Sequence, residues 1–315
     1  MNIVLLESLG ISDELLKRFA SKLTAQGHRF AAYERVNDES VLIERAKDAD
    51  VLMLANMPLS ATVIRACTHL RFINVAFTGV DHVDLNAARE KGVAVSNASG
   101  YSTQAVAELT IGQMLALLRN IKAVEARCRE GGTKAGLVGS ELGARTVGII
   151  GTGAIGQRTA ALCAAFGCRV LGFAPHQRPE AEKYLRYVPL EQLLAEADIV
   201  ALHCPLNEST KGLISRERLA QMKPSAYLVN MARGPVVDSQ ALADALNEGR
   251  LAGAAIDVFE GEPPIAADHP LLKAKNCLVT PHIAFATQES MALRAQIVFD
   301  SLDAWLGGTQ RNKII

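Results

Sequence analysis

Short apolar runs alternate with longer amphipathic stretches along most of the chain. Residues 51–54 and 199–202 are continuous apolar runs that predict buried strands. Residues 12–26 predict an amphipathic helix that begins after Ser12 and ends before Gly27. Strands of a parallel sheet are buried by helices on both faces, so they lack the alternating pattern of half-exposed strands. We therefore expect an α/β protein with two Rossmann-like, doubly wound parallel-sheet units.

The same pattern of apolar runs and amphipathic stretches predicts the remaining strands and helices. Further strands are expected at residues 3–6, 29–33, 72–75, 93–95, 147–150, 169–173, 227–230, 254–258 and 277–279. Residues 103–120 predict a helix that is apolar around most of its circumference, which indicates burial on several sides or in a partner subunit. We interpret this helix as the contact of a homodimer. Residues 287–306 predict a last helix without a strand of its own, and we expect it to pack back on the first unit.

Charge and cysteine content narrow the class of protein. The chain has 315 residues, with 33 Lys and Arg against 33 Asp and Glu, so no net field favours nucleic acid or an anionic membrane as a partner. The N-terminus lacks a charged leader, and no apolar run is long enough to span a bilayer. The six cysteines are scattered without metal-ligand spacing. We expect a soluble cytoplasmic protein with free thiols and no metal.

A glycine-rich turn stands at the centre of the pattern, where residues 147–150 run into Gly151-Thr-Gly153-Ala-Ile-Gly156. Gly151 permits a tight turn, Gly153 lets backbone amides approach a pyrophosphate, and Gly156 lets the next helix pack closely on the strand. The N-terminus of that helix would attract the phosphates. A purely structural turn is the alternative, but the apolar strand before it and the helix of small residues after it favour dinucleotide binding.

Polar residues follow several predicted strands of the second half, and functional groups of open α/β sheets collect at the carboxyl ends of strands. These residues are His203, Arg233, Asp257, Glu262 and His282. Arginine can clamp a carboxylate through two parallel hydrogen bonds. A carboxylate next to a histidine favours the imidazolium and keeps a proton available near neutrality. Together they are the groups needed to bind a small anion and move a proton.

Each of these residues also has a purely structural reading. Arg233 could form a surface salt bridge, and Glu262, which precedes two prolines, could be a solvated loop acid. His282 could be a satisfied structural histidine. His203 is more readily placed in the lining of a nucleotide cleft than in catalysis. Asp257 could accept a hydrogen bond from a carboxamide or serve as a strand-end carboxylate.

In their order along the chain, these motifs resemble the D-isomer-specific 2-hydroxyacid dehydrogenases, the family of glycerate, phosphoglycerate, glyoxylate/hydroxypyruvate and D-lactate dehydrogenases. The resemblance covers nearly the whole chain. The matching segments begin at Phe77-Thr-Gly-Val-Asp-His, Val106-Ala-Glu-Leu, the glycine turn, His203-Cys-Pro-Leu, Asn230-Met-Ala-Arg-Gly, Asp257-Val-Phe-Glu-Gly-Glu-Pro and Thr280-Pro-His-Ile-Ala.

The resemblance implies an oxidoreductase that moves a hydride between a nicotinamide dinucleotide and a small D-2-hydroxyacid or 2-oxoacid, such as a glyoxylate-, hydroxypyruvate- or phosphoglycerate-like compound. It implies that Arg233 binds the substrate carboxylate, that His282 is the general acid/base and that Glu262 orients and charges this histidine. Substrate contacts are implied for Thr78, Gly79, Val80, Tyr101 and Met57. A binding protein that senses NAD(H), similar to the animal corepressors of this fold, is the alternative function.

The resemblance also implies a discontinuous substrate-binding domain of residues 1–98 plus 286–315 and a dinucleotide-binding domain of residues 99–285. Cofactor contacts are expected at Val106, Gly151, Gly153, Ala154, Ile155, Gly156, Ala174, Arg178, His203, Cys204, Pro205, Thr210, Met231, Ala232, Asp257 and Ala284.

One position departs from the pattern of NAD-selective members. They carry an acid at the end of the second strand for the ribose 2′-hydroxyl, and this chain has Ala174 there. No carboxylate at this position would repel a 2′-phosphate, and Arg178 or His176 could bind one. We expect NAD or NADP, with a slight preference for NADP.

Overall fold

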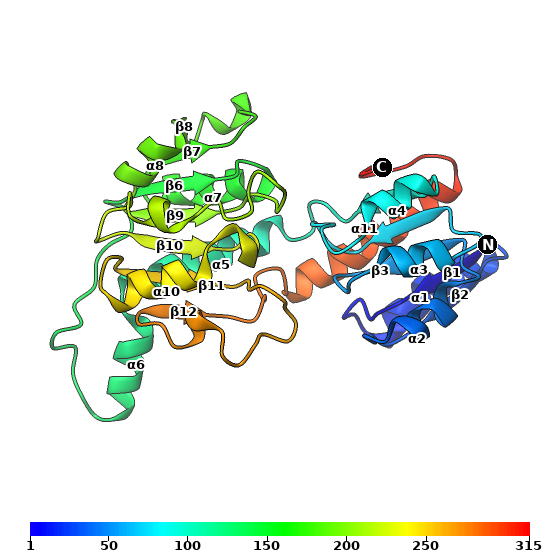
Figure 1. Ribbon diagram of the computed structural model, residues 1–315, viewed down its shortest axis with the longest axis horizontal. Coiled ribbons are helices and arrows are strands. Elements are labelled where there is room, and N and C mark those ends of the chain that lie inside the picture. Colours follow the sequence, from blue (N-terminus) through cyan, green and yellow to red (C-terminus); the bar gives the residue numbers. More distant parts are fainter. The chain divides into compact units, whose positions relative to one another are not determined.

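The computed structural model describes residues 1–315, and the chain divides into two compact units (Figure 1). The first unit comprises residues 1–102 and 286–315, and the second comprises residues 103–285. The chain passes between them twice, next to the turn-rich segment 97–102 and directly after Phe285. No helix combines the length and the apolar character that crossing a membrane requires.

A five-stranded parallel sheet forms the centre of the first unit, in the order β2-β1-β3-β4-β5. Its strands are β1 (Asn2–Leu5), β2 (Arg29–Ala32), β3 (Val51–Leu54), β4 (Phe72–Val75) and β5 (Ala94–Asn97). Its helices are α1 (Asp13–Ala25), α2 (Glu39–Ala46), α3 (Ala61–Ala66), α4 (Leu85–Glu90) and α11 (Gln288–Leu306). Each helix begins after a Ser, Asp or Thr whose side chain accepts a backbone N–H of the first turn, which satisfies one of the donors left over at a helix start.

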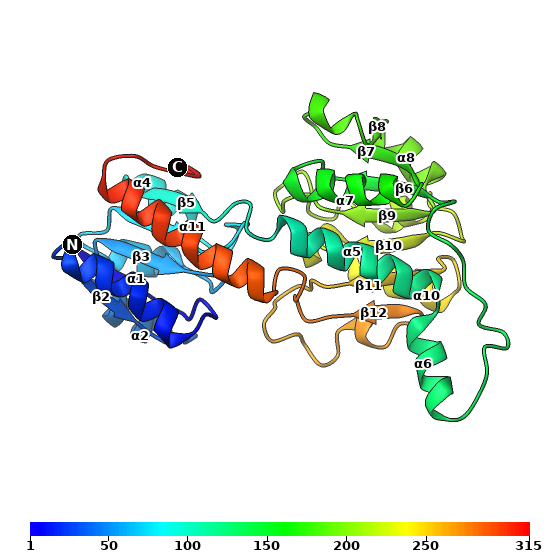
Figure 2. The same cartoon turned by 180° about the vertical axis from the view of Figure 1, so that it is seen from behind.

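The last helix, α11, belongs to the first unit although it follows the second in sequence. Asn74 of β4 donates its side-chain amide to the carbonyl of Val298 over 2.8 Å. The rings of Phe72 and Trp305 are stacked with their centroids 4.8 Å apart. Figure 2 shows α11 running across one face of this sheet. The contacts confirm that this helix packs back on the first unit, where it covers strands that would otherwise be exposed on that face.

The second unit holds a seven-stranded parallel sheet in the order β12-β11-β10-β9-β6-β7-β8. Its strands are β6 (Thr146–Ile150), β7 (Arg169–Phe173), β8 (Arg186–Tyr187), β9 (Ile199–Leu202), β10 (Tyr227–Asn230), β11 (Gly253–Ile256) and β12 (Cys277–Val279). Its α-helices are α5 (Thr103–Leu118), α6 (Ile121–Arg129), α7 (Ala154–Ala165), α8 (Leu190–Glu196), α9 (Arg216–Leu219) and α10 (Ser239–Asn247). Short 3₁₀ turns occupy Pro179–Ala181, Gly234–Val236 and Pro270–Leu272.

The strand order of the second unit reverses next to β6. From β6 the chain continues outward to β7 and β8, and it then returns to pair β9 on the other side of β6. Ligands of doubly wound sheets bind where the strand order reverses, outside the carboxyl ends of the strands. The segments that follow β6 and β9 are therefore the first place to look for a site.

The α5 region differs from the sequence prediction in two respects. The predicted helix 103–120 ends at Leu118, because Asn120 has a left-handed φ of 54°, and a second helix, α6, follows that the pattern did not predict. No α6 residue is buried, so the helix lacks the apolar stripe by which it could have been recognised. The apolar circumference of α5 packs within the unit, against α7 and strands β10 and β11. Burial by a partner subunit is therefore not needed to explain its sequence.

Candidate active site

The glycine turn lies directly after β6. Gly151 has φ of +93°, which favours glycine, and its N–H donates to the carbonyl of Phe173 over 2.9 Å. A Cβ atom at Gly151 would stand 2.5 Å from the backbone nitrogen of Cys204, which follows β9. The turn is thus packed against the segment after β9, at the reversal of strand order.

The other two glycines have different roles, close packing at Gly156 and an open helix start at Gly153. A Cβ at Gly156 would lie 1.9 Å from the carbonyl oxygen of Gly151, so only glycine lets α7 start this close to the strand. Gly153 meets open space instead, and it caps α7 without a side chain that could accept the first-turn N–H groups. Uncapped N–H groups facing open space are what an anion such as a pyrophosphate requires. The turn fits a dinucleotide.

These two glycines give a matched pair of variants. We expect Gly156→Ala to lower the free energy of unfolding by about 1–3 kcal/mol or more, because the methyl group would overlap a backbone oxygen that cannot move alone. Gly153→Ala should keep the stability but weaken dinucleotide binding, since its methyl group would occupy the open space. Chemical denaturation and fluorescence titration with NADH and NADPH measure the two effects. Equal stability of both variants would contradict this division.

His203 follows β9 beside the glycine turn. Both of its ring nitrogens are buried without a hydrogen-bond partner in the protein. Burial lowers the pKa of His203 to about 4, because the imidazolium would lose its hydration, so the ring is neutral at physiological pH. A neutral ring with unused polar atoms at this position suits the wall of a nucleotide site, as the sequence predicts, and does not suit a proton carrier.

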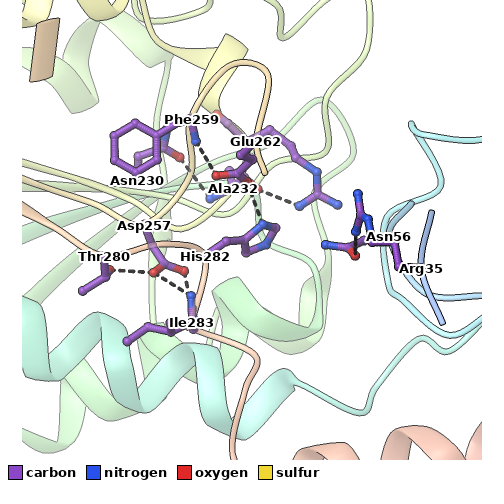
Figure 3. A network of polar contacts seen from close by, with 12 residues as sticks. Arg35, Asn56, Asn230, Ala232, Asp257, Phe259, Glu262, Thr280, His282 and Ile283 are labelled. Atoms are coloured by element: carbon purple, nitrogen blue, oxygen red, sulfur yellow. Dashed lines mark hydrogen bonds and ion pairs between the residues drawn. The ribbon is translucent and has the colours of Figure 1, made fainter. Parts of the chain in front are cut away.

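Glu262 and His282 form a close pair in the second unit. Glu262 Oε1 lies 2.6 Å from Nδ1 of His282, and the two side chains are only 14% and 18% exposed. The other oxygen, Oε2, accepts the backbone N–H of Phe259 over 2.9 Å, so both carboxylate oxygens are engaged (Figure 3). The carboxylate thereby fixes the orientation of the His282 ring.

The backbone of His282 is held in an unusual conformation. Its φ of 54° is left-handed, and its N–H donates to the carbonyl of Asp257 over 2.7 Å. Asp257 is fully buried, and its carboxylate accepts the hydroxyl of Thr280 and the N–H groups of Ile283 and Ala284 (Figure 3). Burial raises the pKa of Asp257, and these hydrogen bonds oppose the rise. Asp257 therefore acts as the strand-end carboxylate that shapes the His282 loop, and a contact with the cofactor stays a prediction.

Arg233 follows β10, the strand next to β11. The side chain of Asn230 shapes this turn, because it donates to the carbonyl of Arg233 over 3.0 Å and accepts the N–H of Ala232 over 3.0 Å. A Cβ at Gly234 would come within 2.2 Å of the carbonyl carbon of Phe259. The Arg233 turn and the Glu262 loop are thus in backbone contact. The strand order β10-β11-β12 brings Arg233, Glu262 and His282 to one edge of the sheet.

In the first unit, the residues with implied substrate contacts follow β3, β4 and β5. Thr78 lies after β4; its hydroxyl is buried without a protein partner, and its carbonyl accepts the side chain of Asn97 over 2.6 Å. Gly79 and Val80 continue this partly exposed segment. Tyr101 is buried, with the guanidinium of Arg294 5.7 Å from the centre of its ring.

Sequence reasoning missed a buried acid beside Met57. Glu7 follows β1, and its Oε1 accepts the N–H groups of Ala55 over 2.8 Å and Met57 over 2.7 Å. Its other oxygen faces Arg35 at 3.4 Å, and Arg35 also donates to Asn56 over 3.1 Å (Figure 3). The sequence does not indicate this role for a single glutamate after an apolar run. Glu7 binds backbone N–H groups about 50 residues further along the chain, and backbone groups are not distinguished by residue type.

Comparison with known proteins identifies the family to which the chain belongs. Residues 111–284 match the family model described as D-isomer specific 2-hydroxyacid dehydrogenase, NAD binding domain. The chain belongs to this family. A hydroxypyruvate reductase of Blautia hydrogenotrophica is 36% identical and covers 90% of each chain. A glyoxylate reductase of Korarchaeum cryptofilum is 40% identical over 86% of this chain and 83% of its own. A solved glyoxylate reductase from Paecilomyes thermophila is 26% identical, with a TM-score of 0.90 over 100% of this chain and 98% of that one.

As a member of the D-isomer-specific 2-hydroxyacid dehydrogenases, the protein is an oxidoreductase that uses a nicotinamide dinucleotide and acts on a small hydroxyacid or oxoacid. All residues expected to contact the cofactor lie in the second unit, which contains the matched segment. Val106, Cys204, Met231, Ala232 and Ala284 are buried there, whereas Ala154 and Pro205 are exposed. The hydroxyl of Thr210 donates to the carbonyl of Pro205 over 2.6 Å and shapes the segment after β9.

The segment after β7 bears on the choice of dinucleotide. Ala174 directly follows β7 and is half-buried. The backbone N–H of Arg178 donates to the hydroxyl of Tyr187 over 3.0 Å, and Tyr187 donates to Thr152 of the glycine turn over 2.8 Å. The guanidinium of Arg178 is exposed and 3.8 Å from Glu180. The sequence had no signal for this link, since Tyr187 belongs to a short edge strand.

Proposed function

We propose that the protein reduces a small 2-oxoacid of the glyoxylate or hydroxypyruvate type to the D-2-hydroxyacid. The observation that carries the proposal is the 2.6 Å contact between Glu262 and His282 beside the Arg233 turn. The relatives named glyoxylate reductase and hydroxypyruvate reductase support this substrate class. No observation favours the alternative of a binding protein that only senses NAD(H).

In this proposal Arg233 binds the substrate carboxylate, and its planar guanidinium fixes the direction of the C1–C2 bond. His282, held by Glu262, donates the proton from Nε2 to the oxygen on C2 during reduction and takes it back during oxidation. A reduced nicotinamide, when bound, supplies the hydride to C2. The resulting hydroxyl carries the histidine proton, and Glu262 stabilises the charge on His282 before the transfer.

The first unit supplies the remaining proposed substrate contacts. Backbone N–H groups around Thr78, Gly79 and Val80 would bind the carboxylate, and the unpartnered hydroxyl of Thr78 adds a donor. Tyr101 and Met57 would line the space for the substituent on C3. We propose that the first unit, expected from the sequence as residues 1–98 plus 286–315, is the substrate-binding domain, and that the second, expected as residues 99–285, is the dinucleotide-binding domain; the structure divides the chain after residue 102.

A panel assay tests the proposed function. Purified protein is mixed with glyoxylate, hydroxypyruvate and larger 2-oxoacids, each with NADH and with NADPH, and the loss of nicotinamide absorbance is followed. We expect turnover of the small oxoacids and none in the His282→Ala protein. Dinucleotide binding without turnover of any 2-oxoacid would favour the sensing alternative and overturn the proposal.

We propose a slight preference for NADP over NAD. Ala174 places no carboxylate near the expected ribose position, and Arg178 is tied to the glycine turn through Tyr187 and Thr152. Its exposed guanidinium, held only by a 3.8 Å contact to Glu180, is available to bind a 2′-phosphate.

An acid at position 174 should reverse this preference. We expect Ala174→Asp to shift the ratio of kcat/KM for NADH to that for NADPH toward NADH by about 10- to 100-fold, because like charges placed together cost several kcal/mol. Ala174→Ser is the matched control without charge, and it should leave the ratio within about twofold. An unchanged ratio in the Asp variant would refute the cofactor argument.

We further propose a cytoplasmic homodimer. Figures 1 and 2 show α6 and the loop after it extending away from the sheet of the second unit. Ile121 is 53% exposed in α6, and Val138 is 80% exposed in the following loop. A second copy of the chain would bury these apolar side chains. Light scattering of the intact protein at several concentrations measures the oligomeric state.

A further inference from the structure

The loop that carries Glu262 has few hydrogen bonds between backbone groups to fix its conformation. Apart from a turn at residues 260–261, residues 258–265 make no backbone-to-backbone hydrogen bond. The loop contains Gly261, with φ of +73°, followed by Glu262 and two prolines, so it has neither helical nor strand geometry to stiffen it. Because Glu262 must stay 2.6 Å from His282, side-chain contacts have to place this loop.

Glu260 supplies those contacts. Its two oxygens accept the hydroxyl of Ser239 at 2.9 and 3.1 Å, and Oε2 also lies 2.8 Å from Nε2 of His269. Nδ1 of His269 accepts the N–H of Leu271 over 3.4 Å, so the proton on Nε2 is directed at Glu260. The ring of His269, itself buried, meets the ring of Phe259 edge-on with the centroids 5.0 Å apart. Glu260 and its neighbour Phe259 are thereby tied to two other segments, the start of α10 and the segment before Pro270.

The loop also packs against the backbone of the Arg233 turn. A Cβ at Gly234 would lie 2.2 Å from the carbonyl carbon of Phe259 and 2.5 Å from the nitrogen of Glu260. Ser239, which binds Glu260, begins α10 five residues after Gly234. The contacts of Glu260 therefore hold the loop on one side, and the Arg233 turn limits its movement on the other.

We propose that Ser239, Glu260 and His269 form a positioning triad that sets Glu262 against His282. The inference rests on the proposed oxidoreductase function, in which His282 delivers a proton. None of the three residues touches the substrate in this proposal. They act through Glu262, and they do so within the second unit.

The first test uses Glu260→Gln, which keeps the shape but can no longer accept both donors. We expect kcat for oxoacid reduction to fall about 10-fold, with the oxoacid KM within about threefold and the Kd of the dinucleotide unchanged, because small displacements of a catalytic pair reduce the rate more than binding. Glu248→Gln, an exposed acid paired with Arg250, is the control and should behave as wild type.

The second test changes one atom of the triad. Ser239→Ala removes the hydroxyl and should lower kcat by about 3- to 10-fold, whereas Ser239→Thr keeps it and should restore the rate to within about twofold of wild type. A merely structural role would not depend on the hydroxyl in this way. Equal losses in the Ala and Thr variants, or a wild-type kcat in Glu260→Gln, would overturn the proposal.

A readout that needs no turnover separates this proposal from the proposed function. Hydrogen–deuterium exchange at the amides of residues 259–262 should be faster in Glu260→Gln and Ser239→Ala than in wild type, while the amides of β10 are unchanged. If wild type reduces no oxoacid but this exchange difference is present, the proposed function fails and the positioning triad stands. Exchange identical to wild type in both variants would overturn the triad.

Discussion

The His282→Ala protein is expected to lose roughly two to four orders of magnitude in kcat for oxoacid reduction, the range that a single general acid contributes. The loss follows from the role proposed for His282, whose Nδ1 lies 2.6 Å from Glu262 and whose Nε2 would donate the proton. Cofactor affinity should be largely kept, since the ring is not part of the glycine turn. Steady-state kinetics and fluorescence titration with the dinucleotide measure the two quantities.

His69→Ala is a suitable control for this experiment. His69 is exposed in the first unit, between α3 and β4, and is no part of the proposed site. Its removal should leave kcat and KM unchanged. Wild-type activity in the His282 variant would exclude this histidine as the general acid, and a loss of dinucleotide binding would assign it a different role.

Removing the Arg233 side chain is expected to lower kcat/KM for the oxoacid by roughly 10²- to 10⁴-fold, which corresponds to about 3–5 kcal/mol for the loss of a charged partner of a buried carboxylate. The KM should rise and kcat should also fall, because the guanidinium both binds the substrate and orients it. Arg233→Lys should recover only part of the loss, since an ammonium group cannot form two parallel hydrogen bonds.

The control here is Arg250→Ala, which removes an exposed arginine paired with Glu248 after α10. We expect no change in kcat/KM, because exposed ion pairs contribute about 0–1 kcal/mol and this one is remote from the Arg233 turn. If Arg233→Ala changes kcat/KM no more than the control does, the carboxylate is bound elsewhere.

Much of the scaffold could be predicted because local sequence decides it. Residues 51–54, 169–173 and 199–202 are strands with the predicted bounds, since continuous apolar runs of this length fit only buried strands between helices. The cap Ser12 accepts an N–H group of the helix that it was expected to start. In contrast, α6 was missed because none of its residues is buried.

The candidate site was predictable as a set of residues but not as an arrangement. Arg233, Glu262 and His282 stand out because polar side chains after apolar strands collect at one edge of a parallel sheet. Glu7, Ser239, Glu260 and His269 did not stand out. They bind backbone groups or side chains from other segments, and no spacing along the chain indicates such contacts.

The sequence by itself determined the parallel α/β class, the glycine turn for a dinucleotide and the family, because these depend on apolar periodicity, on backbone freedom at single positions and on ordered motifs. Only the tertiary structure decided how β10, β11 and β12 lie side by side, and with them how closely Glu262 approaches His282. It also revealed that Glu260 ties the loop that carries Glu262 to other segments of the second unit. The physical reason is that distances between residues far apart in sequence arise from packing, which is settled only when the whole unit has folded.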